Sequence, residues 1–97
     1  MPINVNMEPM HPGTYIKEAI LPDDLSMTKV ADMLNVGRSA ISKLLNEKSS
    51  LTPEMAMRVE MAFGVSMEML LRIQVRHDAY NVRKRAQDFA VSPYSAH

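Results

Sequence analysis

The chain has 97 residues, a length typical of a single small domain, and a formal net charge of zero at pH 7. It contains no cysteine, which excludes disulfide bonds and thiolate metal sites and fits a reducing compartment. The first residues lack the basic region and following apolar run that are typical of a secretory signal. No apolar stretch approaches the roughly 18 residues of a membrane-spanning helix. We therefore expect a cytoplasmic protein with no membrane partner.

Charge is unevenly distributed along the chain. Residues 1–25 carry a net charge of −3, whereas residues 26–50 carry +2 and residues 72–85 carry +4. Blocks of this size are also common on solvated helix faces, so charge alone does not identify a nucleic-acid-binding protein.

The first segment, residues 1–12 (MPINVNMEPMHP), contains three prolines and no sustained apolar period, so we expect a flexible arm. A short first helix is predicted over residues 14–21, because Ile16, Ala19 and Ile20 lie on one face of such a helix. The proline that follows is expected to end it.

A second helix is predicted to start at Ser26, whose hydroxyl can accept a hydrogen bond from an early backbone N–H. It is expected to end at Asn35-Val36-Gly37, since asparagine tolerates the left-handed conformation of a tight helix exit. A third helix is predicted over residues 38–46. Apolar residues recur at helical spacing in both: Val30, Ala31 and Leu34 in the second, and Ile41, Leu44 and Leu45 in the third.

Two further helices are predicted. Thr52 followed by Pro53 is a strong helix start, and this fourth helix is expected to end near Phe63, just before a glycine. Ser66 is expected to cap a fifth helix that runs to about residue 87.

Together these elements predict an all-α fold of five helices, because no segment alternates convincingly with period two. The domain is expected over residues 13–88, between the arm and an unstructured tail over residues 89–97. The chain contains no internal repeat or low-complexity tract.

The second and third predicted helices have the spacing of a helix-turn-helix. Their apolar residues anchor one helix against the other, Val36 fills the turn, and Ala31 is small where the two backbones approach closely. A plain helical hairpin has similar spacing, but it does not require the apolar positions, the small residue and the turn to agree. We therefore expect the outer face of residues 38–46 to enter a DNA major groove.

The polar side chains of this unit suit double-stranded DNA. Arginine can donate two hydrogen bonds to a guanine edge, and hydroxyl and ammonium groups donate to bases or phosphates. The start of a helix favours a phosphate oxygen, because its first N–H groups have no partner within the helix. We predict base reading by Arg38, Ser39, Ser42 and Lys43, and phosphate contacts by Ser26, Thr28, Asn46, Lys48 and Ser49.

One helix-turn-helix contacts only a few base pairs, so useful specificity requires two copies of the chain. The fifth predicted helix is the candidate pairing element, because its apolar surface is wider than one inner face needs. The predicted homodimer interface consists of Val65, Met69, Leu70, Ile73 and His77. The alternative, that these residues only build the core of the monomer, stays open.

The run LSMTKVADMLNVGRSAISKLLNEKSSLTPEMAMRVEMAFGVS resembles the Xre/Cro-type helix-turn-helix of phage repressors. The wider run from HPGTYIKEAI to LLRIQVRHDA, with Gln74 and Asp78 in its last helix, resembles the HigA branch of that superfamily, also called VapI-like antidote proteins. This resemblance implies a lambda-repressor-like fold and an antitoxin of a HigB/HigA-type toxin–antitoxin pair. Such antitoxins bind a palindromic operator as homodimers, repress their own operon and neutralise an RNA-cleaving toxin.

Four positions depart from the pattern of that branch. Glycine is usual where Asn35 and Glu47 stand, and an aromatic residue is common where Leu70 and His77 stand. We expect each of the first two departures to cost about 1 kcal/mol, because a side chain disfavours the left-handed backbone that glycine adopts freely.

An enzyme is the contrasting interpretation, with His77 and Asp78 beside Arg76, or His11 with Glu8, as acid–base groups. No glycine-rich phosphate loop, nucleophile elbow or metal-spaced histidine cluster accompanies them. We therefore expect no enzyme, cofactor, metal or small-molecule substrate. A stand-alone Xre-family regulator without a toxin remains the alternative to the antitoxin, because toxin contact needs no recognisable chemistry.

Overall fold

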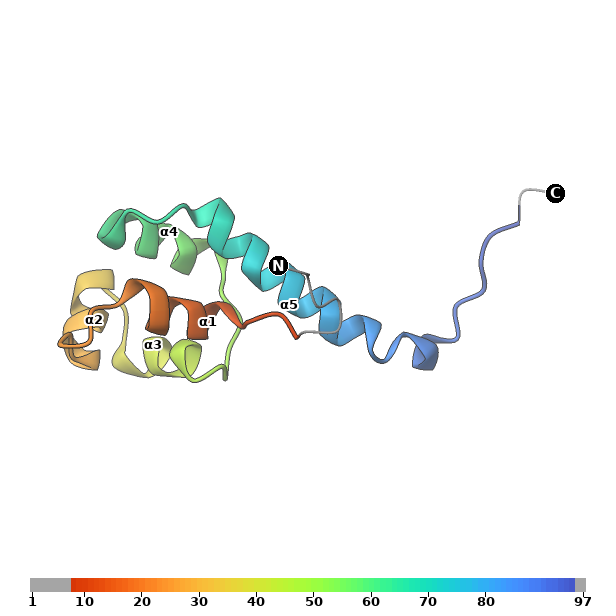
Figure 1. Ribbon diagram of the computed structural model, residues 1–97, viewed down its shortest axis with the longest axis horizontal. Helices are drawn as coiled ribbons and strands as arrows, with labels where there is room; N and C mark the ends of the chain where they lie inside the picture. The colour runs from red at the N-terminus through yellow and green to blue at the C-terminus, as the bar shows by residue number, and fades with distance from the viewer. Residues whose placement is uncertain (1–7, 96–97) are drawn as a thin grey trace, which may run out of the picture.

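The computed structural model describes residues 8–95, and this part of the chain consists of helices and the loops that join them (Figure 1). The helices are α1 (Pro12–Tyr15), η1 (Ile16–Ile20), α2 (Met27–Leu34), α3 (Arg38–Leu45), α4 (Pro53–Phe63), α5 (Met67–Arg83) and η2 (Ala86–Phe89). η1 continues α1 directly as a wider, π-helical turn, so the two form the first of the five predicted helices. The all-α prediction is confirmed.

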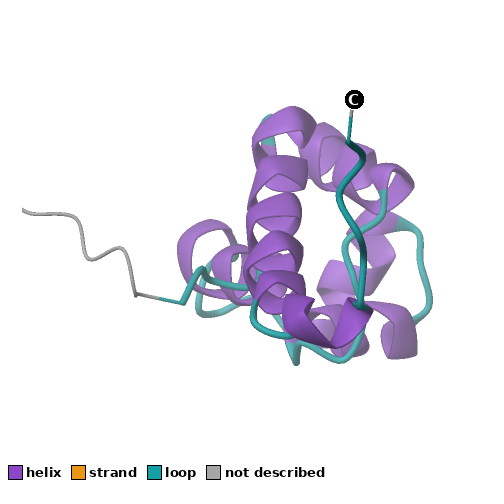
Figure 2. Cartoon of the chain, turned by 90° about the vertical axis from the view of Figure 1, so that its right-hand side faces the viewer, coloured by secondary structure: helices purple, strands orange, loops and turns teal. Residues whose placement is uncertain are grey.

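The helices enclose one apolar core. α4 packs against α5, α2 packs against α3 and α4, and α1 packs against α3 and α5. Figure 2, viewed at right angles to Figure 1, shows these helices gathered around a common centre. All the apolar residues that predicted the second and third helices are in this core, which consists of Ile16, Val30, Ala31, Leu34, Ile41, Leu44, Leu45, Leu51, Ala56, Val59 and Leu70.

Side-chain caps set the starts of three helices. Ser26, Thr52 and Ser66 each accept a hydrogen bond from the backbone N–H three residues further along the chain. Each cap satisfies an N–H that has no partner within its helix. α4 ends at Phe63 as predicted, and Gly64 follows in the left-handed conformation with a φ of 73°.

The first helix begins at Pro12, two residues earlier than predicted. His11 caps it, because its Nδ1 accepts a hydrogen bond from the N–H of Gly13 at 2.9 Å. His11 and Pro12 are both buried, so the expectation of a flexible arm over residues 1–12 is wrong for these two residues. Residues 1–7 of that predicted arm lie outside the described part.

Gly13 lets the first helix lie directly against the end of α3. A Cβ atom at this position would lie 1.8 Å from the backbone oxygen of Leu44. No side chain fits in that space, so the close approach of the two backbones depends on glycine.

The last long helix ends earlier than predicted. α5 stops at Arg83, and the short 3-10 turn η2 follows it. Residues 83–85 are three consecutive cations, and every residue over 82–95 is exposed, so no tertiary packing supports an α-helix here. Beyond η2 the tail runs away from the body without further helix as far as residue 95 (Figure 1).

Candidate nucleic-acid interface

α2 and α3 form a helix-turn-helix, as predicted. Asn35 ends α2 in the left-handed conformation with a φ of 54°, and the N–H of Val36 donates to the backbone oxygen of Ala31 at 3.0 Å. Gly37 then precedes the first residue of α3 in extended conformation. The apolar residues of both helices face the core, so the opposite face of α3 is turned to solvent.

An arginine of α4 holds the turn between α2 and α3. The guanidinium of Arg58 donates to the backbone oxygens of Leu34 at 2.8 Å and of Asn35 at 3.2 Å. It also forms an ion pair with Glu54, one helical turn earlier on α4, at 3.2 Å. The sequence analysis missed Arg58, because its partners are backbone atoms distant in sequence, which leave no spacing signal.

The four predicted base-reading residues share the outer face of α3. Arg38 and Ser39 in its first turn and Lys43 in its last turn are exposed. Ser42 is half-buried, and its Oγ accepts a hydrogen bond from the side-chain amide of Asn46 at 3.3 Å. The first turn therefore presents an arginine and a hydroxyl that can both donate to a base edge.

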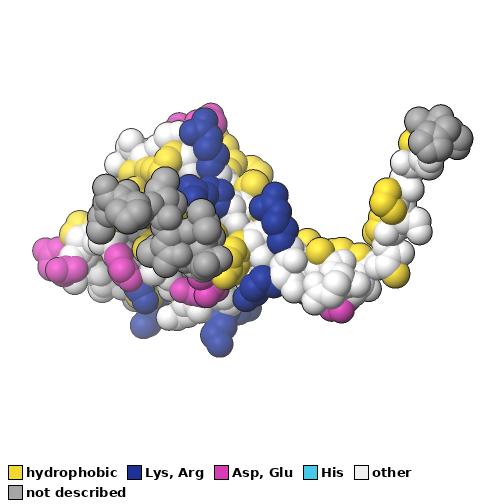
Figure 3. Space-filling model, turned by 45° about the vertical axis from the view of Figure 1, so that its right-hand side comes forward, with side chains coloured by type: hydrophobic (Ala, Val, Ile, Leu, Met, Phe, Trp, Pro, Cys, Tyr) yellow, Lys and Arg dark blue, Asp and Glu magenta, His cyan; other side chains and the backbone are white. Residues whose placement is uncertain are grey.

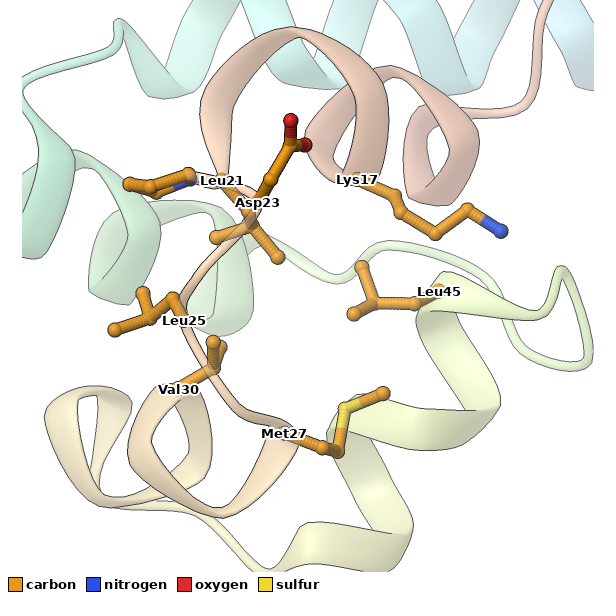
Figure 4. Close-up of a pocket in the computed structure, with 8 residues that line it drawn as sticks. Lys17, Leu21, Asp23, Leu25, Met27, Val30 and Leu45 are labelled. Atoms are coloured by element: carbon orange, nitrogen blue, oxygen red, sulfur yellow. The ribbon is translucent and has the colours of Figure 1, made fainter.

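The predicted phosphate-contacting residues come from two segments that meet at one end of the helix-turn-helix. Figure 4 shows Met27, at the start of α2, close to Leu45, at the end of α3. Both residues line a small cavity of about 190 Å³ between these helix ends and the turn after η1. The predicted phosphate contacts Ser26, Thr28, Asn46, Lys48 and Ser49 flank these two helix ends and are all exposed.

Lys17 is a cation at this end that sequence reasoning missed. It is exposed on η1, lines the same cavity, and in Figure 4 its side chain extends past Leu45. The lysine lies in a segment with a net charge of −3, so the charge distribution along the sequence did not indicate it as a DNA-binding residue. It can add to the positive potential around the ends of α2 and α3.

Of the five predicted dimer residues, Val65 lies in the loop just before α5, and the other four lie on α5 itself. Leu70 is 0% exposed within the single chain, so the prediction that it contacts a second copy is wrong: it is a core residue. Val65 and Met69 are half-buried against the core, and the ring of His77 packs edge-on against that of His11. The prediction stays a prediction for Val65, Met69, Ile73 and His77, each of which is partly exposed.

The outward side of α5 carries apolar residues that the sequence analysis did not select. Val75 is 63% exposed and Val82 is 40% exposed. Val75 lines a shallow groove on α5 together with Leu71, Glu68, Arg72 and Arg76. Figure 3 shows apolar side chains between Lys and Arg side chains on the face of the molecule it presents.

Within residues 8–95, no helix combines the length and the apolar composition needed to cross a membrane.

Comparison with known proteins agrees with this geometry. Residues 16–70 match the helix-turn-helix family. Virulence-associated protein A of Dichelobacter nodosus is 35% identical over 82 residues, which cover 82% of this chain and 80% of that protein. A HigA-family antidote protein of Coxiella burnetii is 28% identical with a TM-score of 0.76, over 91% of this chain and 100% of the other. The antitoxin GraA, solved in complex with its operator, shares the fold at 21% identity with a TM-score of 0.81, over 98% of this chain and 100% of the other. The chain belongs to the helix-turn-helix family of DNA-binding regulators.

Proposed function

We propose that the chain is the antitoxin of a HigB/HigA-type toxin–antitoxin pair. As a homodimer it binds a palindromic operator, represses its own operon and neutralises an RNA-cleaving toxin. The observation that carries the proposal is the outward face of α3. Arg38, Ser39 and Lys43 are exposed there, while the apolar residues on the opposite face of the same helix are buried in the core. The likeness to the Coxiella burnetii HigA-family protein supports the antitoxin part.

Arg38 is the main base-reading residue in this proposal. It stands in the first turn of α3, and the N-terminal residues of a recognition helix are the ones that reach base edges. A guanidinium can donate two hydrogen bonds to the O6 and N7 atoms of one guanine, whereas a single hydroxyl cannot. Ser39 and Lys43 add donors along the same face, and the half-buried Ser42 contributes less.

Lys48 acts differently, as a contact to the DNA backbone. It lies three residues beyond the end of α3 and is exposed, so it flanks the reading helix instead of standing on it. A lysine at such a position neutralises a phosphate and carries no sequence information. Its contribution should therefore fall as salt concentration rises.

These two roles give a direct test with a DNA duplex that the wild-type chain selects from a randomised pool. Arg38→Ala should weaken binding by about 1–3 kcal/mol and relax the preference at one base position. Lys48→Ala should weaken binding to all duplexes alike and reduce the slope of log affinity against log salt by about 1. Fluorescence anisotropy titrations at several salt concentrations measure both effects.

Lys84→Ala is the matched control, because Lys84 is also an exposed lysine and stands at the C-terminal end of α5, outside the helix-turn-helix. It should leave affinity and base preference unchanged. If Arg38→Ala binds the selected duplex as tightly as the wild-type chain does, α3 is not the reading helix and the proposal is wrong.

The toxin is tested separately by co-expression with the product of the neighbouring upstream gene. An antitoxin forms a stable complex with that product and relieves the growth arrest that it causes. A chain that binds its operator but forms no such complex is a stand-alone regulator, the alternative function.

A further inference from the structure

The loop that leaves the recognition helix is anchored at several points. This exit loop, residues 46–51, joins α3 to α4 and carries the predicted phosphate contacts Asn46, Lys48 and Ser49. Glu47 within it has a left-handed φ of 62°, a conformation that a loop without further contacts would hold poorly. The course of this loop decides where its exposed side chains meet a DNA backbone.

Two anchors come from the first helix. The hydroxyl of Thr14 donates a hydrogen bond to the carboxylate of Glu47. The ring of His11 lies beside the backbone of Ser49, which acts to raise the pKa of the imidazole. Together with the contact between Gly13 and the end of α3, they hold the first half of the exit loop against α1.

The third anchor comes from Gln74 in the middle of α5. Its Oε1 accepts a hydrogen bond from the backbone N–H of Leu51 at 2.6 Å, and its Nε2 donates to Oδ1 of Asp78 at 2.8 Å. Gln74 is only 6% exposed, whereas Leu70, one turn earlier on the same side, is an ordinary apolar core residue. A buried amide is unfavourable unless it is hydrogen-bonded, so its place in the core depends on these two partners.

We propose that Gln74 is a positioning residue for DNA binding, fixing the exit loop so that Lys48 and Ser49 are presented to phosphates. This inference rests on the proposed function. A loop already held in its bound shape loses less conformational entropy on binding, which favours affinity without any contact between Gln74 and DNA. Because Gln74 belongs to α5, the same helix sets the loop and carries the candidate dimer surface.

The orientation of the Gln74 side chain depends on Asp78. The Asp78 carboxylate can only accept when ionised, so it selects the amide orientation in which Nε2 faces Asp78 and Oε1 faces Leu51. Reversing the two groups should preserve this arrangement. A carboxylate at position 74 still accepts from Leu51, and an amide at position 78 donates to it.

The test compares three variants of the full chain on the duplex selected by the wild-type chain. Gln74→Leu keeps the approximate side-chain size but leaves the N–H of Leu51 without its acceptor. We expect about tenfold weaker binding, a smaller salt slope, unchanged base preference and faster hydrogen exchange at the Leu51 amide. Gln74→Glu alone should also weaken binding, since two carboxylates then face each other. Gln74→Glu combined with Asp78→Asn should restore affinity, salt slope and slow exchange.

Phe63→Leu is the stability control, because Phe63 packs against the core at the end of α4, away from the exit loop. It should lower the thermal midpoint without changing the salt slope. A Gln74→Leu chain that is less stable but binds with wild-type affinity and slope would overturn the positioning role. If Gln74→Leu does not fold, failure of the double variant to rescue the binding lost in Gln74→Glu overturns it instead. Arg38→Ala separates the two proposals. If Arg38→Ala loses affinity and the Gln74 variants do not, the proposed function stands and only the positioning role of Gln74 is wrong.

Discussion

His11 shows how a single residue joins three distant parts of the chain. Its Nδ1 accepts a hydrogen bond from the N–H of Gly13, and its ring meets that of His77 at a centroid distance of 4.8 Å. The ring also lies beside the backbone of Ser49, which acts to raise its pKa. Burial and the nearby His77 lower the pKa of His11 below 6.5, although Glu47 and Asp78 act in the opposite direction. The cap also requires an unprotonated Nδ1, because a protonated nitrogen cannot accept a hydrogen bond.

This environment predicts a loss of stability in acid. The unfolded chain protonates His11 at its ordinary pKa of 6.5 and the folded chain only at a lower pH, so between these values the unfolded state binds more protons. The stabilising contribution is complete above pH 6.5 and is lost as the pH falls towards the folded pKa. The thermal midpoint, followed by circular dichroism, should therefore fall more steeply with acid in the wild-type chain than in His11→Asn. Asparagine can cap the helix without titrating. Equal slopes in the two chains would contradict this role.

At the residue scale, the sequence predicts those backbone conformations that depend only on residues adjacent in the chain. The two positions where glycine is usual, Asn35 and Glu47, have φ values of 54° and 62°, the left-handed region expected from the departure. The roles of His11 and Gln74 were not predictable. Their partners lie in segments far apart in sequence, and only the packed helices bring them together.

At the scale of elements, α4 supports the helix-turn-helix through one side chain. The last carbonyl groups of a helix have no partner within it, and Arg58 supplies two donors to those at the end of α2. A cation there is also favoured by the negative end of the helix dipole. Arg58 therefore fixes the exit of α2, and with it the angle at which α3 leaves the turn.

Removing this contact should destabilise the domain. Arg58→Ala should lower the free energy of unfolding in urea by roughly 1–2 kcal/mol, since two charge-assisted hydrogen bonds are lost but water can reach the partly exposed carbonyl groups. Glu54→Gln, which removes the exposed ion pair with Arg58 and a carboxylate from the first turn of α4, should change it by less than about 1 kcal/mol. If both variants lose equal stability, the ion pair and not the cap is the stabilising contact.

In α5, the repeat of apolar residues predicts the helix but not its orientation. The repeat does not tell which of the two apolar sides faces the core. Leu70 was predicted to belong to a pairing surface, yet it is a fully buried core residue, whereas Val75 and Val82 on the other side of α5 are exposed. The choice is made by α1 and α4, which cover the inner side, and a single helix sequence does not contain their positions.

At the scale of the whole molecule, α5 is the element that reaches beyond the body. Its C-terminal part continues past the other helices into the tail (Figure 1). From residue 82 onward every described residue is exposed, and the apolar Val75 and Val82 face outward. A helix in this position can bring two copies of the chain together while each α3 stays accessible, as binding to two half-sites requires.

A charge placed on the outward face of α5 should separate the two copies. Val75→Arg puts a cation into an apolar contact beside Arg72 and Arg76, where burial and like-charge repulsion both oppose association. Sedimentation velocity should show a monomer, and affinity for the selected palindromic duplex should fall on the order of a hundredfold, because two-site binding is lost. Met61→Arg is the control, since Met61 is 76% exposed on α4, and it should remain dimeric. A monomeric Met61→Arg chain beside a dimeric Val75→Arg chain would place the pairing surface on α4 instead.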